Sequence, residues 1–575
     1  MLITAIRRGP HIAVPGGEKT AAGLASLVAA VAYMGIAALH GAIGVPRNDD
    51  WTYLRSAYRL ASDGIFTPGT STAMLVGQTV LAWPVVRVFG PEVAPLQVLV
   101  ALVGSLGLWA AYLAVRRVLP PSWSAFSVGC LALGPVFGSL DSSFMTDVPA
   151  FSLQMLALLA GLHALRSRDL AINWFAASLL AGIAAFSIRE YAVAAPVAVI
   201  AAAFLRTRPK RLRPGWKVVG LTVLWLAVLA ALVIWRRGLS GSLPESFLGS
   251  SRLAIAPLFR AGFTLALFVT PLLPLVSIPR LVASLRASRG IAIVLGLGVS
   301  TTWAVFFWSG HHRGPLLGNY VTETGAYSVT IPGTAPVVIP PGLWTVLEVL
   351  SLASLLMLAF LGLVGASGLL RSRTATKPGL VASPGNGQTV MLLFCVTTIG
   401  VLQAAKLLMN TPLFDRNLVP IIPFVVALAV RVALDHGLVV RRTGLVVTLA
   451  LAVFGSLGIG MVDTTATFDG AKWQLARSVE AQGYEAGSID GGYEWFSYHQ
   501  TGPIVQRPVV PGTNFWLSQF AERPVCVTSQ FEGSPPTGHL GAGVTVVSTV
   551  SARSLLGVDY HLIAVSGPAS CRPGE

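Results

Sequence analysis

The sequence predicts an all-α polytopic membrane protein that ends in a small α/β domain. Hydrophobic residues make up 54% of its 575 residues and charged residues only 11%, and the mean hydropathy is +0.71. A water-soluble domain normally carries about 25% charged residues, so lipid must solvate much of this chain. Apolar runs of about 20 residues, the length that crosses a bilayer, recur along the chain, and a more polar pattern follows residue 462.

Thirteen of these runs are predicted to span the membrane. The first follows a basic N-terminus and is too long for the core of a signal peptide, so it is expected to be an uncleaved span. A run at 72–89 is interrupted by Gln78, Pro84 and Arg87, and we expect it to form a helix at the outer interface. The thirteen runs lie near 21–45, 93–115, 123–140, 147–165, 170–187, 191–205, 216–235, 261–279, 291–309, 342–370, 389–409, 417–434 and 443–462.

The distribution of Lys and Arg predicts the orientation. If 72–89 is not counted as a span, all but one of the loops that connect spans on one side of the membrane are basic. Counting it as a span would move Arg116, Arg166 and Arg280 to the other side. Cytoplasmic loops carry the excess of Lys and Arg, so we expect residues 1–20 in the cytoplasm and 463–575 outside a plasma or inner membrane. The same clustering in short loops accounts for the net charge of +16 and argues against nucleic-acid binding.

The transmembrane domain is predicted to comprise residues 21–462, and its outer side to consist of two long loops, the shorter segments 141–146, 188–190, 236–260 and 410–416, and the C-terminal segment. The loop 46–92 follows the first span, and the loop 310–341 is long enough to cover an acceptor or to form a purely structural lid. About 110 C-terminal residues suffice for a small domain. A helix is expected there at 471–482 and strands at 525–529, 544–550 and 561–565. Cys526 and Cys571 fall in this segment, and a disulfide between them is left open.

Acidic residues on the predicted outer side are candidates for chemistry. Asp49 and Asp50 directly follow the first span and begin an amphipathic helix that contains Tyr53, and Asp147 begins another helix on the same side. Each could simply cap its helix. Basic groups also fall on this side, and snorkelling explains any one of them, yet together they predict a single polar cavity. They are Arg189, His311, His312, Arg313, Lys406 and Arg416.

The order of these motifs resembles the type C (GT-C) membrane glycosyltransferases, in particular the protein O-mannosyltransferase and aminoarabinose transferase group. Asp-Asp-x-x-Tyr follows the first span, an interfacial helix comes next, and Thr-Asp-x-Pro begins the fourth span. Arg-x-Leu-x-Pro-x-x-Pro leads the penultimate span. The resemblance is strongest over 20–205 and returns at 410–434. It implies a similar thirteen-span plan and an outer C-terminal domain.

The resemblance also implies roles for individual residues. Asp49 matches the first position of a catalytic acid pair that is usually Asp-Glu, and since Asp50 stands second here, which of the two faces the acceptor is open. Asp147 resembles the second-loop acid. Arg416 resembles the basic residue near the donor phosphate, with Arg189 and Lys406 as further candidates. The substrate loop would include Tyr53, His311, His312 and Arg313.

The predicted function is transfer of a sugar from a polyprenyl-phosphate donor to a hydroxyl of a glycan, glycolipid or protein, with inversion. A divalent cation beside the carboxylates is left open, and adjacent histidines are poorly placed to share one ion. The sequence has no G-x-x-x-x-G-K-[ST] motif for ATP and no nucleotide-sugar fingerprint. The alternatives are a transporter or lipid flippase, which would carry charges near the membrane centre, and a non-catalytic assembly factor.

Overall fold

The computed structural model describes residues 14–69, 73–166, 170–206, 215–239, 255–285, 296–298, 316–325, 330–374, 387–409, 413–440, 443–500, 514–520, 525–534 and 543–567. Helices dominate these residues, and four short strands lie near the C-terminal end. The elements of the first half are α1 (Gly16–Leu39), α2 (Asp50–Asp63), α3 (Val76–Phe89), α4 (Val93–Val115), α5 (Pro121–Ala132), α6 (Pro135–Asp141), α7 (Asp147–Ala164), α8 (Ile172–Phe186), η2 (Glu190–Val193), α9 (Ala194–Arg206), α10 (Trp216–Arg237), α11 (Ile255–Val269), η3 (Thr270–Leu275) and α12 (Ile278–Leu285). Those of the second half are α14 (Pro341–Thr374), α15 (Gly387–Met409), η5 (Asp415–Leu418), α16 (Ile422–Asp435), α17 (Thr443–Glu480), η6 (Ala486–Ser488), β1 (Ile489–Asp490), α18 (Tyr493–His499), η7 (Phe515–Gln519), β2 (Val527–Phe531), β3 (Thr545–Arg553) and β4 (Asp559–Ser566).

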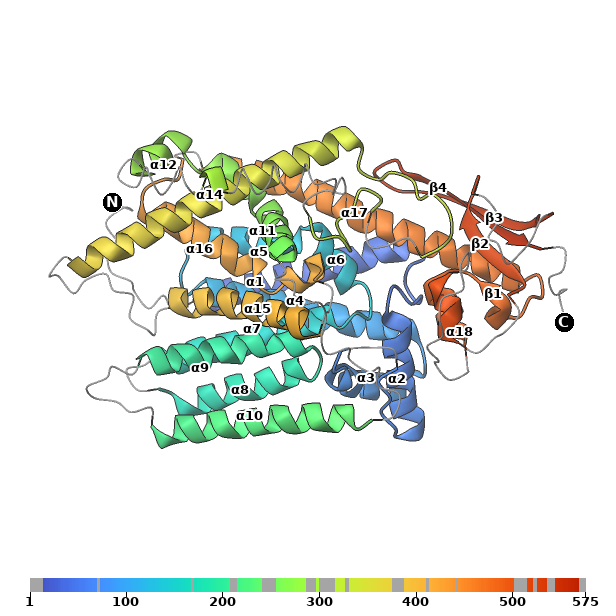
Figure 1. The fold of residues 1–575 in the computed structure, drawn as a ribbon, viewed down its shortest axis with the longest axis horizontal. Coiled ribbons are helices and arrows are strands. Elements are labelled where there is room, and N and C mark those ends of the chain that lie inside the picture. Colours follow the sequence, from blue (N-terminus) through green and yellow to red (C-terminus); the bar gives the residue numbers. More distant parts are fainter. Residues whose placement is uncertain are drawn as a thin grey trace.

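The long helices form a bundle that is suited to a membrane (Figure 1). Among the described residues, eight helices are long and apolar enough to cross a bilayer, or nine if α5 and α6, which meet at a bend of 70°, form one span. The prediction of thirteen spans is not confirmed. Helices α8, α9 and α16 have 15, 13 and 14 residues, or roughly 20–22 Å at 1.5 Å per residue, less than a bilayer core of about 30 Å. Most of the predicted span at 291–309 lies outside the described residues.

Helices α2 and α3 occupy the predicted outer loop. Figure 1 shows α2 lying across the end of the bundle rather than along it, between the bundle and α18. The interrupted run at 72–89 forms α3, a 14-residue helix with Pro84 inside it. The buried Gln78 side chain donates from Nε2 to the carbonyl oxygen of Phe144 at 3.2 Å, so this polar residue faces protein. A helix this short, with its amide turned inward, agrees with the expectation that it does not span.

The C-terminal domain is joined to the bundle by a single long helix. Helix α17 has 38 residues, roughly 57 Å at 1.5 Å per residue, and so extends well beyond a bilayer core. It continues without a break through residue 463, and its far part packs against β3 and β4. The predicted domain boundary at 463 therefore falls inside a helix, and the helix expected at 471–482 is its last part.

A four-stranded sheet completes this domain. Its strand order is β1-β2-β4-β3, with β1 parallel to β2 and the other neighbours antiparallel. The three strands expected from the sequence are present as β2, β3 and β4, each shifted or lengthened by a few residues. Cys526 is disulfide-bonded, and Cys571, whose pairing with it the sequence left open, lies outside the described residues. Cys130 and Cys395 are buried and free.

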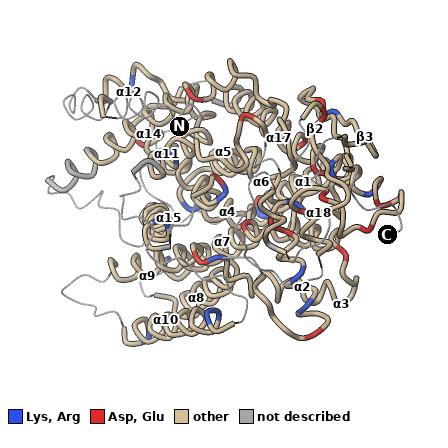
Figure 2. The backbone as a smooth tube through the Cα atoms, turned by 45° about the vertical axis from the view of Figure 1, so that its right-hand side comes forward, with Lys and Arg blue, Asp and Glu red and all other residues tan. Residues whose placement is uncertain are grey.

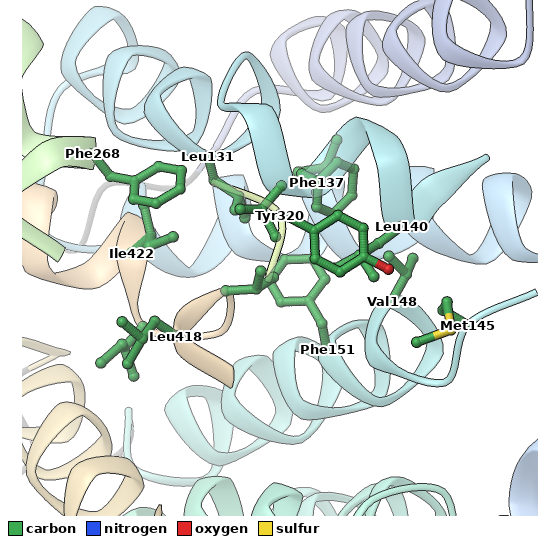
Figure 3. Packing of buried hydrophobic residues seen from close by; sticks show 14 of the residues in the cluster. Leu131, Phe137, Leu140, Met145, Val148, Phe151, Phe268, Tyr320, Leu418 and Ile422 are labelled. Atoms are coloured by element: carbon green, nitrogen blue, oxygen red, sulfur yellow. The ribbon is translucent and has the colours of Figure 1, made fainter. Parts of the chain in front are cut away.

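A buried apolar cluster supports the end of the bundle at which α7 begins (Figure 3). The rings of Phe137 and Phe151 meet edge to face at 5.8 Å between centroids. Figure 3 shows the ring of Tyr320, from the segment before α14, lying among Phe137, Leu140 and Val148. This cluster fixes the start of α7, which carries Asp147.

Candidate functional site

Asp49 lies at the start of α2, at the end of the bundle that meets the C-terminal domain. It is the N-cap residue of α2, and its side chain is 33% exposed. Its Oδ2 lies 3.7 Å from Nη2 of Arg416, and its Oδ1 accepts a hydrogen bond from the Tyr493 hydroxyl at 3.3 Å. Asp49 is therefore an accessible carboxylate flanked by a guanidinium and a phenol.

Asp50 occupies an opposite environment. Its side chain is fully buried, and Oδ2 accepts backbone N–H bonds from Phe144 at 2.9 Å and Arg47 at 3.3 Å. Burial raises the pKa of Asp50 to about 8. This side chain joins the start of α2 to the loop before α7, so it holds the two acidic loops together.

Asp147 and Arg189 form a buried ion pair beside Tyr53. Asp147 is the first residue of α7, and its Oδ2 lies 3.1 Å from Nη2 of Arg189. The Tyr191 hydroxyl donates to Oδ1 of Asp147 at 3.3 Å. Arg189 also donates to Thr146 Oγ1 at 2.5 Å and to the Tyr53 hydroxyl at 3.4 Å. Burial raises the pKa of Tyr53 to about 12, so its hydroxyl is neutral.

Arg416 carries unused hydrogen-bonding capacity. Its side chain is 7% exposed and stacks over the Phe414 ring, with 5.1 Å from Cζ to the ring centroid. Nε and Nη1 have no hydrogen-bond partner within the described part of the chain. The preceding Asp415 accepts the backbone N–H groups of Tyr320 and Val321, both at 2.8 Å, so it fixes the backbone that presents Arg416. Two buried donors on a permanent cation are suited to an anion.

The structure thus brings together Asp49, Asp50, Tyr53, Asp147, Arg189 and Arg416, which come from four separate parts of the chain. Lys406 lies in the last turn of α15. His311, His312 and Arg313 lie outside the described residues. Among the residues that are described, no three His, Cys, Asp or Glu side chains come close enough to hold a metal ion, and Asp49 and Asp147 each lie beside an arginine instead.

A buried charge network behind Asp49 was not predicted. Arg47 Nε lies 2.7 Å from Oδ2 of Asp469, and Lys472 Nζ lies 3.6 Å from Asp469 Oδ1 and 2.6 Å from Glu494 Oε2. Glu494 Oε1 accepts the backbone N–H of Asn48 at 3.2 Å. Asn48 has a φ of 53°, in the left-handed region that Asn tolerates better than most residues. The network therefore fixes an unusual backbone directly before Asp49.

A sequence signal for this network exists in α17. Asp469 and Lys472 stand three residues apart in a helix that continues an apolar span, and residues at that spacing share a helix face. Glu494 lies in a segment whose aromatics and acids could suit either sugar binding or local packing. In the structure Glu494 is buried, and Tyr493 packs edge-on against Trp51 with 5.8 Å between centroids. Figure 2 shows acidic and basic positions mixed around α2, α18 and the strands.

Comparison with known proteins locates a family match in the first half of the chain. Residues 78–235 match the model of the dolichyl-phosphate-mannose-protein mannosyltransferases. This range includes Asp147 and Arg189 and ends before Arg416. No curated protein sequence matches the chain.

Two of the proteins whose solved structures match this chain are ArnT and an archaeal oligosaccharyltransferase. ArnT from Cupriavidus metallidurans, in the apo state, is 13% identical with a TM-score of 0.38, and the match covers 94% of this chain and 97% of that one. The same protein bound to undecaprenyl phosphate is 14% identical with the same score and coverage. The apo oligosaccharyltransferase of Archaeoglobus fulgidus is 14% identical with a TM-score of 0.42, over 86% of this chain and 61% of that one. The family match confirms the resemblance inferred from the motifs: this is a multi-pass helical membrane protein similar, over residues 78–235, to membrane glycosyltransferases of the GT-C group.

Proposed function

We propose that this protein transfers a sugar from a polyprenyl-phosphate donor to an acceptor hydroxyl at the extracytoplasmic face of the cell membrane, with inversion at the anomeric carbon. One observation carries the proposal. The accessible Asp49 carboxylate lies 3.7 Å from Arg416, whose Nε and Nη1 are buried and have no partner among the described residues. A base for an alcohol and a binding site for a leaving phosphate are thus adjacent.

Asp49, rather than Asp50, is the proposed base. A base must reach the acceptor hydroxyl, and Asp49 is a third exposed whereas Asp50 is fully buried. Asp50 also holds the backbone of Phe144 and Arg47. The hydrogen bond from Tyr493 occupies Oδ1 of Asp49, whereas Arg416 Nη2 lies 3.7 Å from Oδ2, beyond hydrogen-bond distance, so Oδ2 can accept the acceptor proton. The proton transfer is worth roughly 10²–10⁴-fold in rate.

Arg416 is the proposed partner of the donor phosphate. As the bond from acceptor oxygen to anomeric carbon forms, the bond from that carbon to the phosphate oxygen breaks, and the electron pair stays on the phosphate. The departing group is already a stable anion, so no strong acid is needed, and a buried guanidinium stabilises its growing charge. Attack on the face opposite the phosphate inverts the carbon. Arg189 is paired with Asp147, and we assign it to positioning the residues around Asp147. Lys406 is a candidate for a second contact with the phosphate. His311, His312 and Arg313 are candidates for binding the acceptor.

The test is a transfer assay with the purified protein, polyprenyl phosphates carrying radiolabelled hexoses or pentoses, and a panel of glycan, glycolipid and peptide acceptors. Asp49→Asn is expected to lower turnover at least about 100-fold. Asp63→Asn, at the exposed end of the same helix, is the matched control and should leave turnover unchanged. Turnover near the parent level in a well-folded Asp49→Asn protein would contradict the assigned base. Lipid translocation without sugar transfer would favour the transporter alternative.

Orientation has its own test. Arg59→Cys lies on the exposed face of α2, and Arg280→Cys lies on the exposed α12 at the other end of the bundle. A membrane-impermeant maleimide added outside intact cells should label position 59 and spare position 280. Because Cys130 and Cys395 are buried, they give little background. The reverse labelling pattern would refute the extracytoplasmic placement of Asp49.

A further inference from the structure

A basic cavity lies at the end of the bundle opposite to Asp49. Its volume is about 150 Å³, and it is lined by Lys19 of α1, Arg117 after α4, and His163 and Arg166 at the end of α7. Asp147 and His163 begin and end the same helix, so the cavity lies roughly 24 Å from the candidate active site at 1.5 Å per residue. The two sites are therefore separate.

The positive charges in this cavity have no acidic partner among its lining residues. Nη2 of Arg117 donates a hydrogen bond to Nε2 of His163 at 2.7 Å, and Arg117 Nε is buried with no partner within the described residues. The neighbouring Arg116 shows the contrast, since its Nε pairs with Glu18 at 2.5 Å. Lys19, Arg117 and Arg166 place three positive charges around one cavity whose lining holds no carboxylate, so a bound anion would reduce their mutual repulsion.

The walls of the cavity indicate what kind of anion fits. Leu113 and Leu159 line it together with the basic groups, and the His163 ring is stacked on Trp174 with 4.9 Å between centroids. One water needs roughly 10–15 Å³ by this measure, so about 150 Å³ holds a larger group. Helix α1, which forms one side, is mostly exposed along its apolar length, as expected for a surface in contact with lipid.

We propose that this cavity binds a phosphate group, supplied by the head group of an anionic phospholipid in the leaflet opposite to the active site. Arg117 and Arg166 hold the phosphate oxygens, Lys19 adds charge, and the leucines contact the glycerol and the first methylenes of the lipid. Basic pockets between transmembrane helices bind acidic head groups in this way. Free inorganic phosphate shares the same chemistry and is the other source that a test must distinguish. The proposal is independent of the proposed transferase activity.

Native mass spectrometry of the delipidated full-length protein measures the binding of lipids and phosphate to this cavity. The probes are phosphatidylglycerol, phosphatidylcholine and inorganic phosphate, each titrated against the parent and against Arg117→Gln and Arg166→Gln. Arg166 is exposed, so its variant does not depend on repacking. Arg280→Gln, an exposed arginine at the same end of the bundle, is the matched control. Thermal melting of each variant establishes that it is folded.

The expected result is preferential binding of phosphatidylglycerol over phosphatidylcholine, weakened at least about tenfold by Arg117→Gln and several-fold by Arg166→Gln, and unchanged in Arg280→Gln. Saturable binding of inorganic phosphate with the same dependence on these residues, without lipid preference, would support the anion site and identify the free ion as its ligand. Equal affinity for both lipids, or the same affinity in the parent and in both pocket variants, would overturn the proposal.

Discussion

Lys472→Met should destabilise the protein strongly, because Lys472 lies at the centre of the buried charge network. Its side chain and those of Asp469 and Glu494 are fully buried, and Arg47 supplies the second cation. Two positive and two negative groups thus balance. Methionine keeps the length and apolar stem of lysine and removes only the ammonium, so two buried carboxylates are left with one guanidinium.

The expected cost follows from the burial. Removing one partner of a buried, hydrogen-bonded ion pair costs about 3–5 kcal/mol, because the remaining charge stays desolvated. Lys472 also donates to Thr330 Oγ1 at 2.8 Å, so a third contact is lost. Glu494→Gln in the Lys472→Met protein restores the balance of one cation and one carboxylate, and the Gln oxygen can still accept the N–H of Asn48. The double variant should therefore recover about half or more of the loss.

Denaturant titration followed by tryptophan fluorescence measures these changes, since Trp473 and Trp495 lie next to the network with 4.9 Å between their ring centroids. Lys217→Met, an exposed lysine, is the control and should change the free energy of unfolding by less than about 0.5 kcal/mol. A loss below about 1 kcal/mol for Lys472→Met, or a double variant less stable than the single one, would refute the reasoning.

Three further predictions concern the neighbourhood of the site. Asp50→Asn should flatten the dependence of melting temperature on pH: the folded pKa of about 8 lies above the ordinary 3.8, so the folded state holds a proton that the unfolded state releases, and the parent loses stability as pH rises from about 4 to 8. Gly470→Ala should cost about 1–3 kcal/mol, because a Cβ there would lie 1.7 Å from the carbonyl oxygen of His40, whereas Gly444→Ala in the same helix meets nothing and should be neutral in the same melting assay. Tyr493→Phe should lower kcat about tenfold with little change in KM, since a hydrogen bond to a charged carboxylate contributes roughly 1.5–3 kcal/mol and this one, at 3.3 Å, is long; an unchanged kcat would contradict this.

The residues around Asp49 could be grouped from the sequence because a membrane restricts where they can lie. Once the basic loops define one side, alternation of spans places Asp49, Asp147 and Arg416 on the other side. The structure adds that Arg416 lies 3.7 Å from Asp49 and Arg189 lies 3.1 Å from Asp147. Knowing the side of the membrane limits the candidate site residues to one end of the bundle. Acidic and basic side chains at that end then attract one another, which favours ion pairs between them.

The span count and the network were harder to predict for different physical reasons. Hydropathy identifies apolar segments but does not give the length of the helix that each one forms, and α8, α9 and α16 have only 15, 13 and 14 residues. The contact between Arg47 and Asp469 joins residues 422 positions apart. No local pattern encodes such a pair, because it depends on how far α17 extends beyond the bundle.

The different environments of Asp49 and Asp50 come from the way in which a helix begins. The N-cap residue precedes the first helical turn, while the next residue already follows the helix, so adjacent side chains leave in different directions. Here the N-cap position is open toward Arg416, and the following position points into the loop before α7. A glutamate at the second position is longer by one methylene, and its carboxylate would have to shift to accept the same two N–H groups. The aspartate at 50 therefore fits a role in fixing the loop, and that leaves Asp49 as the carboxylate able to meet an acceptor.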